Sequence, residues 1–540
     1  MAGNKRPNKD QRLRRLLEAG FFPTDLPPPF GSGDFAKYRK HLKAVWPTQS
    51  LQQFSSAPEY YSVPRFGRAR RRFAIINPIN HFKVSFLIAD EWVEIKTFLK
   101  KSKVSEFKPI FDLEGNRTFF GIDFGLIERK TIELLSKYRS CLKTDISRYY
   151  HTIYTHSIPW ALYGKEYSKR NLSAPKFLAS LGNRLDKVVR QSQQNQTIGI
   201  PVGPDTSRVI GEIIGVALEE IISQGLQEFS SRALRYVDDI SIGYDERDSI
   251  ELLLASITKA FSHFELDINL EKTTVVGVGE SLAPEWLSPL RSFRISRAEN
   301  RQQADVEHYF KSALFYSDAN PKDRVLVYAI KRSRSFRIDD AVWPYYVGFL
   351  LRLCRKDSSC TPYVAQIIIE GNFNRRHLDF GLIKKFLIDT IRFHGGIHNY
   401  FEVSWALFIA KALRIKLAKD DLIEVFKAES SVCGLITMDL NSRGLVTGGI
   451  DTSYWSSFYS SDGLKSNMWL LVYEATVKGW LPKAAPCFVQ AHPLFGPMLK
   501  KGISFYDEKR NITKARKELS KQRLHDLVAR RIFENVEDYF

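Results

Sequence analysis

Two adjacent carboxylates, Asp238 and Asp239, interrupt the apolar string ALRYVDDISIGY. The β-branched and aromatic residues on either side predict two short strands joined as a hairpin, with the two acids at its tip. Asp is rare in strands and costly there unless it is solvated, paired or bound to a cation. The string therefore indicates a cation-binding turn, although Asp is also frequent in ordinary turns.

A third carboxylate, Asp145, stands in CLKTDISRYYHTIY, where a short β-like run gives way to an aromatic segment with helical spacing. This position is the end of a predicted strand, and from there Asp145 can converge with Asp238 and Asp239. Mg²⁺ prefers hard oxygen ligands, and two or three Asp residues suffice to hold it beside water and phosphate oxygens. Two such ions, for which Mn²⁺ can substitute, would activate a hydroxyl nucleophile and neutralise a pyrophosphate leaving group.

A Gly/Pro-rich turn lies between these acids along the chain. In GIPVGPDTS, Gly199, Pro201 and Gly203 predict a loop that lets a ligand approach the backbone, followed by an apolar helix that begins near Ser207. The alternative is an ordinary loop in front of a core helix.

A lysine follows the hairpin at the start of another predicted strand. The apolar periodicity of SIELLLASITKAFSHF predicts a helix from about Ser249 to Phe264, and LDINLEKTTVVGV then places Lys272 just before a β-like run. An ammonium group there could protonate departing pyrophosphate. A solvated surface lysine is the alternative.

The order of local patterns predicts an α+β protein in three parts. Residues 1–60 form a basic N-terminal arm, interrupted by three consecutive prolines that exclude a helix interior. Residues 61–295 alternate short Ile-, Val- and Tyr-rich runs with amphipathic helices. Residues 296–540 contain strings such as FGLIKKFLIDTIRF, whose apolar residues recur at helical spacing. We therefore expect a helical C-terminal domain. Its sequence shows no strict repeat, and whether its helices stack in pairs is left open.

Positive charge is concentrated in front of the first predicted strand. Five arginines, Arg65, Arg68, Arg70, Arg71 and Arg72, precede or enter the β-like FAIINPI. Over all 540 residues, 80 Lys and Arg against 60 Asp and Glu give a formal charge of +20. This excess favours a polyanionic partner such as nucleic acid, with a well-solvated basic surface as the alternative.

Several other chemistries are not supported. The chain has five cysteines and no C-x-x-C spacing, which favours neither a zinc site nor a disulfide framework. No uncharged apolar run approaches the roughly 18 residues of a membrane-spanning helix, and MAGNKRPNKDQRLRRLLEAG lacks the apolar core of a secretory signal. We therefore expect a soluble, cytoplasmic protein without membrane contact.

Taken in order, TDISRYY, GIPVGPDTS, YVDD and INLEKT resemble motifs A, B, C and D of the reverse transcriptase palm, and RRRFAIINP resembles the fingers strand of that family. The resemblance covers roughly residues 60–295. It implies right-hand polymerase fingers and palm, followed by a helical domain that replaces or extends the thumb. The opening LLEAGFFPTDLPPPF and the helical extension are most similar to bacterial abortive-infection (AbiK-type) and unknown-group reverse transcriptases used in antiphage defence.

The resemblance also implies roles for individual residues. Asp145 and Asp238 would be the principal metal ligands, with Asp239 and the Ile146 carbonyl completing the site. Tyr150 would lie beneath the incoming sugar and clash with a 2′-hydroxyl, so deoxynucleoside triphosphates are the expected substrates. Lys272 would assist catalysis. The arginine that contacts the triphosphate would be Arg71 or Arg72. The expected nucleotide site is completed by Gly199, Pro201 and Gly203. The residues expected to contact nucleic acid are Arg65, Arg68 and Arg70.

The expected function is a DNA polymerase that acts in antiphage defence and makes a DNA product. Thr197, Ile198 and Gly199 replace the commoner Leu-Pro-Gln-Gly pattern before Ile200 and Pro201, so template-independent or protein-primed synthesis is left open. A noncoding or template RNA and a second copy of the chain are expected candidates for partners. The alternatives are a conventional RNA-templated reverse transcriptase of the retron or group II intron type and a catalytically silent RNA-binding scaffold.

Overall fold

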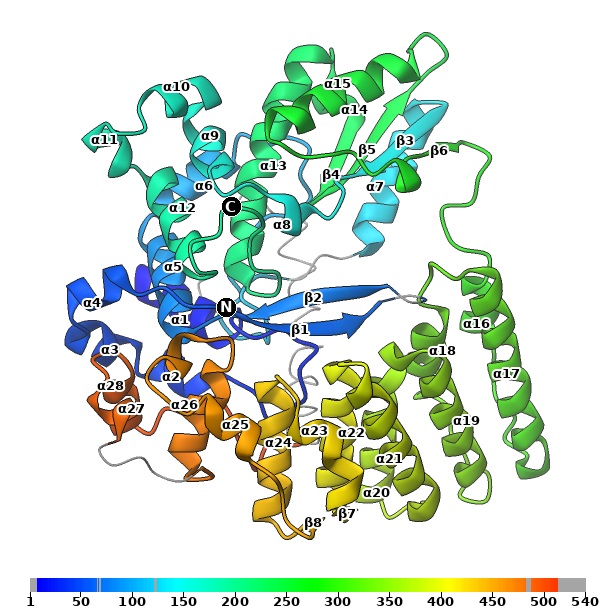
Figure 1. Cartoon of the computed structure of the whole chain (residues 1–540). Coiled ribbons are helices and arrows are strands. Elements are labelled where there is room, and N and C mark those ends of the chain that lie inside the picture. The colour runs from blue at the N-terminus through cyan, green and yellow to red at the C-terminus, as the bar shows by residue number, and fades with distance from the viewer. Residues whose placement is uncertain (1–6, 66, 68, 121–123, 482–486, 513–540) are drawn as a thin grey trace, which may run out of the picture.

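The N-terminal part of the chain packs into the body of the protein (Figure 1). The computed structural model describes residues 7–65, 67, 69–120, 124–481 and 487–512. Helix α1 begins with a capping box, in which the Asn8 side chain accepts a hydrogen bond from the Gln11 amide, and its buried leucines pack toward α5. The elements of this part are α1 (Lys9–Glu18), α2 (Gly33–Lys37), α3 (Arg39–Val45), α4 (Thr48–Gln53) and the antiparallel hairpin β1 (Glu59–Pro64) and β2 (Arg70–Ile75).

A four-stranded antiparallel sheet in the order β4-β5-β3-β6 forms the centre of the next part. Helix α7 packs against β3, β4 and β5, whereas α13 reaches the opposite face, where Arg235 of β4 bonds its side chains. The helices before and around β3 are α5 (Pro78–Asp90), α6 (Trp92–Leu99), α7 (Phe124–Lys137), α8 (Tyr149–Thr152), α9 (Ser157–Tyr163), α10 (Lys165–Arg170), α11 (Pro175–Leu178) and α12 (Leu181–Gln191). The strands and the later helices are β3 (Ser140–Asp145), α13 (Asp205–Gly225), α14 (Phe229–Arg232), β4 (Ala233–Tyr236), β5 (Asp239–Tyr244), α15 (Ile250–His263), the 3₁₀ turn η1 (Leu270–Lys272), β6 (Thr274–Gly277) and α16 (Leu287–Ser292).

Helices dominate the described residues between 296 and 512. Figure 1 shows α17 to α24 side by side in a row, with the hairpin β1–β2 between this row and the central sheet. The elements are α17 (Glu299–Ala319), α18 (Val325–Ser333), α19 (Trp343–Lys356), η2 (Ser358–Cys360), α20 (Thr361–Phe373), α21 (Phe380–Gly396), α22 (Tyr400–Leu413), β7 (Leu417–Ala418), η3 (Lys419–Leu422), α23 (Ile423–Phe426), α24 (Ser431–Ser442), β8 (Val446–Thr447), α25 (Ser453–Ser457), η4 (Gly463–Lys465), α26 (Trp469–Lys478), α27 (Phe488–Ala491) and α28 (Phe495–Lys500). The fold is therefore α+β, as predicted, with a helical C-terminal region.

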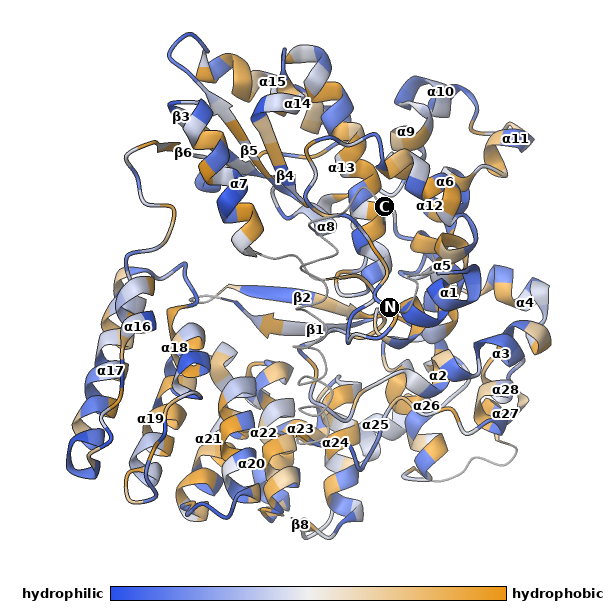
Figure 2. Ribbon diagram, turned by 180° about the vertical axis from the view of Figure 1, so that it is seen from behind, coloured by the Kyte–Doolittle hydropathy of each residue, from blue (hydrophilic) through white to orange (hydrophobic). Residues whose placement is uncertain are grey.

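The row of helices returns to the N-terminal segment. The Gly31 amide donates to the Phe505 carbonyl at 3.0 Å, the Asp507 amide donates to the Pro29 carbonyl at 2.8 Å, and the Trp46 indole donates to the Leu494 carbonyl at 2.7 Å. One connected hydrophobic core runs from Leu13 to Ile512. Figure 2 shows hydrophobic residues gathered along α13 and α22, whereas α17 is largely hydrophilic.

Local predictions can be compared with these bounds. The helix predicted from about Ser249 to Phe264 is α15, with Ser249 as its N-cap. Helix α13 starts two residues before the predicted Ser207, and β2 begins at Arg70 and ends at Ile75, so three of the arginines lie on the strand itself. The short parallel pair β7–β8 was not predicted. Within the described ranges no helix combines the length and the apolar character needed to cross a bilayer.

Candidate active site

The central sheet brings the three predicted carboxylates together. Asp145 is the last residue of β3 and lies directly opposite Asp239, the first residue of β5, while Asp238 occupies the turn between β4 and β5. Directly opposed residues of an antiparallel pair have Cβ atoms about 4.5–5.5 Å apart. The prediction of a hairpin with two acids at its tip is therefore confirmed, and Asp145 points to the same place from another strand.

The turn that carries Asp238 has an unusual backbone. Val237 has a φ of 59°, in the left-handed region, where a β-branched side chain is strained. The preceding Tyr236 pairs with Asp239 across the hairpin, so the turn is as tight as its two intervening residues allow. The surrounding structure must hold Val237 in this conformation.

The electrostatics agree with this proximity. Burial raises the pKa of Asp238, and the charge of Asp145 raises it further. Partial removal from water, together with the charges of Asp238 and Asp145, raises the pKa of Asp239 to about 6. Like charges that repel each other in this way favour a bound cation.

The donors fit a divalent ion. Asp145 is buried, and its Oδ1 atom accepts no hydrogen bond from the described part of the chain, while its Oδ2 atom accepts one from the Lys272 ammonium group. Three carboxylates offer the hard oxygens that Mg²⁺ prefers. Across the described residues, however, no three His, Cys, Asp or Glu side chains are already arranged around one metal position. The Lys272 ammonium group thus neutralises part of the negative charge that a bound cation would otherwise neutralise.

The backbone after Asp145 is fixed by a neighbouring segment. Ile146 is buried and forms an isolated bridge with Ile268, flanked by hydrogen bonds from the Asn269 amide to the Asp145 carbonyl at 2.9 Å and from the Ser147 amide to the Asp267 carbonyl at 2.8 Å. These bonds position the strand end and the Ile146 carbonyl next to it.

Two tyrosines of α8 pack against a glycine of α13. The Tyr149 hydroxyl donates to the Gly211 carbonyl at 2.6 Å, and a Cβ atom at Gly211 would lie 3.1 Å from the Tyr150 ring. Burial raises the pKa of Tyr150, and the charge of Asp238 raises it further. The half-buried Tyr150 ring therefore lies beside the carboxylates, where the resemblance places a sugar.

The Gly/Pro-rich loop connects three elements. The Gly199 amide donates to Ile153 at 2.8 Å, the Ile200 amide donates to Tyr150 at 2.7 Å, and Val202 accepts from Ala74 of β2 at 2.7 Å. Gly199 has a φ of 81°, and a Cβ atom there would lie 2.9 Å from the His151 carbonyl oxygen. Gly199 and Pro201 are buried, whereas Gly203 is half-buried next to Phe73. This loop positions α8 and the start of α13.

The arginines of β2 point in different directions. Strand alternation places Arg71 on the opposite face from Arg70 and Arg72. Burial and the charge of Arg65 lower the pKa of Arg71, whereas the charges of Asp238 and Asp25 raise it, so Arg71 lies within electrostatic range of Asp238. Arg72 instead lies over the Tyr60 ring, with its guanidinium carbon 3.8 Å from the centroid.

The other predicted nucleic-acid contacts have separate outcomes. Arg70 forms a two-point ion pair with the buried Glu402 of α22, with both N···O distances 2.8 Å, so its guanidinium is directed at the helical region, and its contact with nucleic acid stays a prediction. Arg65 lies near the tip of the hairpin, and its charge lowers the pKa of Asp239. Arg68 lies outside the described residues.

Sequence reasoning missed several residues that surround the turn. Arg235, Glu212 and Glu219 form a buried ion cluster directly behind it. Arg208 of α13 lies over the Phe107 ring at 4.4 Å and pairs with Asp205 at 3.4 Å. A signal was present in the sequence: Glu212 and Glu219, seven positions apart in the largely apolar run VIGEIIGVALEEII, favour a buried cation as their partner, and Arg235 directly precedes YVDD.

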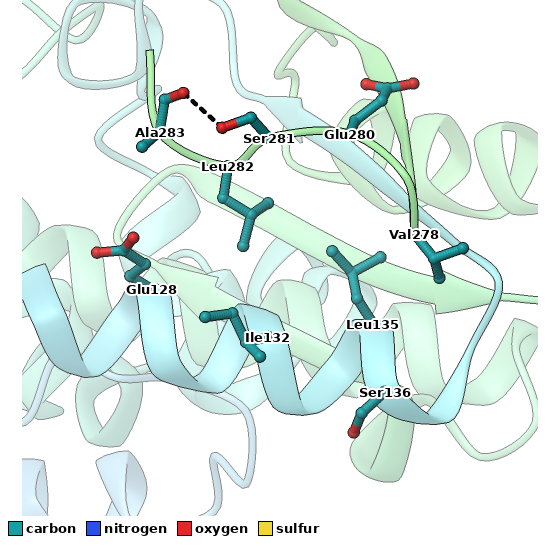
Figure 3. Close-up of a pocket in the computed structure, with 9 residues that line it drawn as sticks. All are labelled: Glu128, Ile132, Leu135, Ser136, Val278, Glu280, Ser281, Leu282 and Ala283. Atoms are coloured by element: carbon teal, nitrogen blue, oxygen red, sulfur yellow. Dashed lines mark hydrogen bonds between the residues drawn. The ribbon is translucent and has the colours of Figure 1, made fainter. Parts of the chain in front are cut away.

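An open groove lies between α7 and the segment after β6. Figure 3 shows Ile132, Leu135, Val278 and Leu282 along its walls, with Glu128 and Glu280 at its sides. None of the predicted site residues lines this groove, so the candidate active site is defined by the sheet end and not by this cavity.

A comparison with protein families covers the stretch of chain that contains the sheet end. Residues 94–301 match a family model described as reverse transcriptase (RNA-dependent DNA polymerase), and no curated protein matches the chain. The match includes Asp145, Tyr150, Asp238 and Lys272 but not the hairpin β1–β2. It implies the fingers and palm fold of a nucleic-acid polymerase. Residues 94–301 of this chain are therefore similar to reverse transcriptase domains.

Proposed function

We propose that the protein is a DNA polymerase of the reverse transcriptase family, which adds deoxynucleotides by two-metal nucleotidyl transfer in antiphage defence. The observation that carries the proposal is the convergence of Asp145, Asp238 and Asp239 from separate chain segments at one end of the sheet. A scaffold that only binds RNA would gain nothing from three clustered like charges, which are destabilising without cations.

Each neighbouring side chain has an assigned task in this reaction. Two Mg²⁺ ions held by the three carboxylates and the Ile146 carbonyl would supply activation of the 3′-hydroxyl and charge neutralisation at the pyrophosphate. Arg71 lies within electrostatic range of Asp238 and is assigned to the triphosphate. Tyr150 is assigned to sugar selection, since its ring is seated against Gly211 beside Asp238. Lys272, already bonded to Asp145, is assigned as the proton donor to pyrophosphate.

The wider assignments rest on the resemblance to abortive-infection and unknown-group enzymes. They comprise the division into an arm (1–60), fingers and palm (61–295) and a helical domain (296–540), the defence role, and synthesis that needs no template or starts from a protein hydroxyl. The departure of Thr197, Ile198 and Gly199 from the common pattern supports altered template handling, and the Ile198 side chain in this loop is exposed.

The test is incorporation by purified full-length protein incubated with Mg²⁺ and each deoxynucleoside triphosphate, with and without co-purifying RNA. Digestion of the product with nucleases and with protease then identifies template and primer. We expect labelled DNA whose attachment to protein survives nuclease treatment. Incorporation that depends strictly on added RNA would instead indicate a conventional reverse transcriptase, and no incorporation with any nucleotide would refute the polymerase assignment.

The matched variants are Asp238→Asn and Glu246→Gln. Both replace a carboxylate with an amide, but Glu246 is an exposed residue paired with Arg139 beyond the far end of β5. We expect Asp238→Asn to abolish incorporation with the fold retained, because metal charge is lost at constant shape, and Glu246→Gln to leave it unchanged. Wild-type incorporation by Asp238→Asn would remove Asp238 from the site.

A further inference from the structure

The guanidinium of Arg235 lies directly behind the turn that carries Asp238. Arg235 is the third residue of β4 and is almost completely buried, with 1% of its side chain exposed. Its backbone is anchored as well, since its amide donates to Val104 and its carbonyl accepts from Glu106, both at 2.8 Å. The side chain therefore has little freedom to move.

Two acidic residues of α13 form a cradle for this guanidinium. Its Nη2 atom donates to Glu212 Oε1 and its Nε atom donates to Glu219 Oε1, both at 2.6 Å. The glutamates are seven residues apart, two helical turns, and so project from one face. Ser105 and Ser102 complete the arrangement by donating to Glu212 at 2.6 Å and to Glu219 at 2.9 Å.

A glycine makes room for the cradle. Gly215 lies between the two glutamates on α13, and a Cβ atom there would be 2.4 Å from Nη1 and 2.7 Å from Cζ of Arg235. An alanine at this position would have to displace the guanidinium or the helix. The absence of a side chain at Gly215 thus provides the space that the Arg235 guanidinium occupies.

One hydrogen bond of the guanidinium leaves the cradle and reaches the turn. Nη1 donates to the carbonyl oxygen of Val237 at 2.9 Å, while it also bonds Glu212 at 3.1 Å. Val237 is the residue held in the left-handed region, a strained conformation for a β-branched residue that persists only where its surroundings fix it. Only a planar guanidinium can span both glutamates and this carbonyl, because the ammonium of lysine is a single point.

We propose that Arg235 is a positioning residue, which holds the Val237 carbonyl and thereby fixes the strained turn so that Asp238 is presented to a divalent cation. The inference rests on the proposed function, whose metal site it explains. It assigns α13 a role in the chemistry, although Glu212 and Glu219 touch no reacting atom.

A purely structural ion cluster would also stabilise the sheet, so the test needs a control for stability. Arg232 provides it: this residue is also buried, lies three positions earlier and pairs with Asp248 at 2.8 Å, away from the turn. We would compare Arg235→Lys and Arg232→Lys in full-length protein by Mn²⁺ binding, measured by electron paramagnetic resonance, and by thermal unfolding. Both should lose stability, but only Arg235→Lys should weaken Mn²⁺ binding, by about tenfold or more.

Relief of the strain gives a second readout. Adding Val237→Gly to Arg235→Lys should recover part of the Mn²⁺ affinity, since glycine adopts a positive φ without the hydrogen bond from Arg235 to the carbonyl of residue 237. In steady-state incorporation, Arg235→Lys should lower kcat and leave the KM for the nucleotide within about twofold, because the triphosphate contacts are untouched. Unchanged Mn²⁺ affinity in Arg235→Lys would overturn the inference.

A milder pair of variants covers the case in which Arg235→Lys does not fold. Gly215→Ala keeps every charge but crowds the guanidinium, whereas Gly225→Ala on the same helix meets only Ser256 at 3.5 Å. We expect weaker Mn²⁺ binding in the first and wild-type binding in the second. Equal binding in both, or no Mn²⁺ binding by the wild type, would overturn the inference, whereas Mn²⁺ binding without any nucleotide incorporation would refute only the proposed polymerase activity.

Discussion

At the scale of single residues, the carboxylates of the candidate site repel one another, and nearby positive charge offsets part of this repulsion. Asp145, Asp238 and Asp239 raise one another's energy when ionised, and in the absence of a cation the Lys272 ammonium offsets part of this cost. A carboxylate whose pKa is raised gives up its proton less readily, so protons and metal ions compete for it. This competition makes the site sensitive to pH in a range where an ordinary Asp is fully ionised.

Asp239 should give cation binding a pH dependence centred near 6. Its pKa in the folded protein is about 6, so the carboxyl is ionised at pH 7 and increasingly protonated below pH 6. We expect Mn²⁺ affinity to be constant above pH 7 and to fall by up to roughly tenfold per pH unit below pH 6. Titrations at pH 5 to 8 would measure this, with Asp239→Asn as the control that should flatten the profile. A wild-type affinity equal at pH 5 and pH 7 would contradict the prediction.

Tyr150 should control the choice of sugar. Its ring packs against Gly211 within electrostatic range of Asp238, so truncation is expected to open the space in which a 2′-hydroxyl would otherwise clash. We expect Tyr150→Ala to reduce the preference for deoxynucleotides over ribonucleotides by about tenfold or more, measured as a ratio of kcat/KM values. Tyr149→Phe is the matched control, because it removes only the hydroxyl that bonds Gly211 and keeps both rings. Undiminished rejection of ribonucleotides would remove Tyr150 from this role.

At the scale of elements, the hairpin β1–β2 is held by the helical region. Glu59, at the start of β1, accepts a hydrogen bond from the Ser431 amide at 2.8 Å at the first turn of α24. The Tyr61 hydroxyl lies 2.8 Å from Ser404 of α22, next to the Arg70–Glu402 ion pair. The strand that carries Arg71 is therefore positioned by helices far along the chain, and this argues that the helical region supports the proposed nucleotide site.

Removing one partner of this ion pair should affect both stability and nucleotide binding. Glu402→Gln should cost about 1–3 kcal/mol in urea unfolding, because the buried acceptor charge is lost while half-buried Arg70 can partly rehydrate. It should also raise the KM for the nucleotide, since Arg71 shares the strand. Asp389→Asn, which removes an exposed pair with Arg355, should change neither measurement appreciably. A normal KM for the nucleotide in a destabilised Glu402→Gln variant would show that the Arg70–Glu402 ion pair does not affect nucleotide binding.

At the scale of the whole molecule, the N-terminal segment and the last helices share one core. Trp469 of α26 is fully buried, its ring lies 6.5 Å from that of Phe21, and its indole donates to the Ile75 carbonyl at 3.2 Å. The proposed domain boundaries therefore follow changes in the sequence pattern, but they do not separate independent hydrophobic cores. Segments that share a core are expected to unfold together.

Calorimetry of the full chain should accordingly show one cooperative transition. Trp469→Ala should lower the temperature of that whole transition and cost about 3–5 kcal/mol, because a large buried side chain is lost from the junction. Phe315→Ala removes an aromatic ring that is 69% exposed and should cost less than about 0.5 kcal/mol. Two transitions, of which only one responds to Trp469→Ala, would show that the helical region unfolds as an independent unit.

The amino-acid sequence by itself determined the local geometry of the site. Alternating β-branched residues around Asp238 and Asp239 predicted the hairpin, a strand-to-helix change predicted the position of Asp145, and helical periodicity predicted α15 and the helices beyond residue 296. These features could be read because hydrophobic periodicity and turn chemistry act between residues a few positions apart.

Only the tertiary structure decided which distant side chains meet. It paired Arg70 with Glu402 across 332 positions, bonded Lys272 to Asp145 and placed Arg235 between Glu212 and Glu219. No local pattern contains these pairings, because a buried charge selects its partner by the packing of whole elements, and that packing depends on every segment that shares the core.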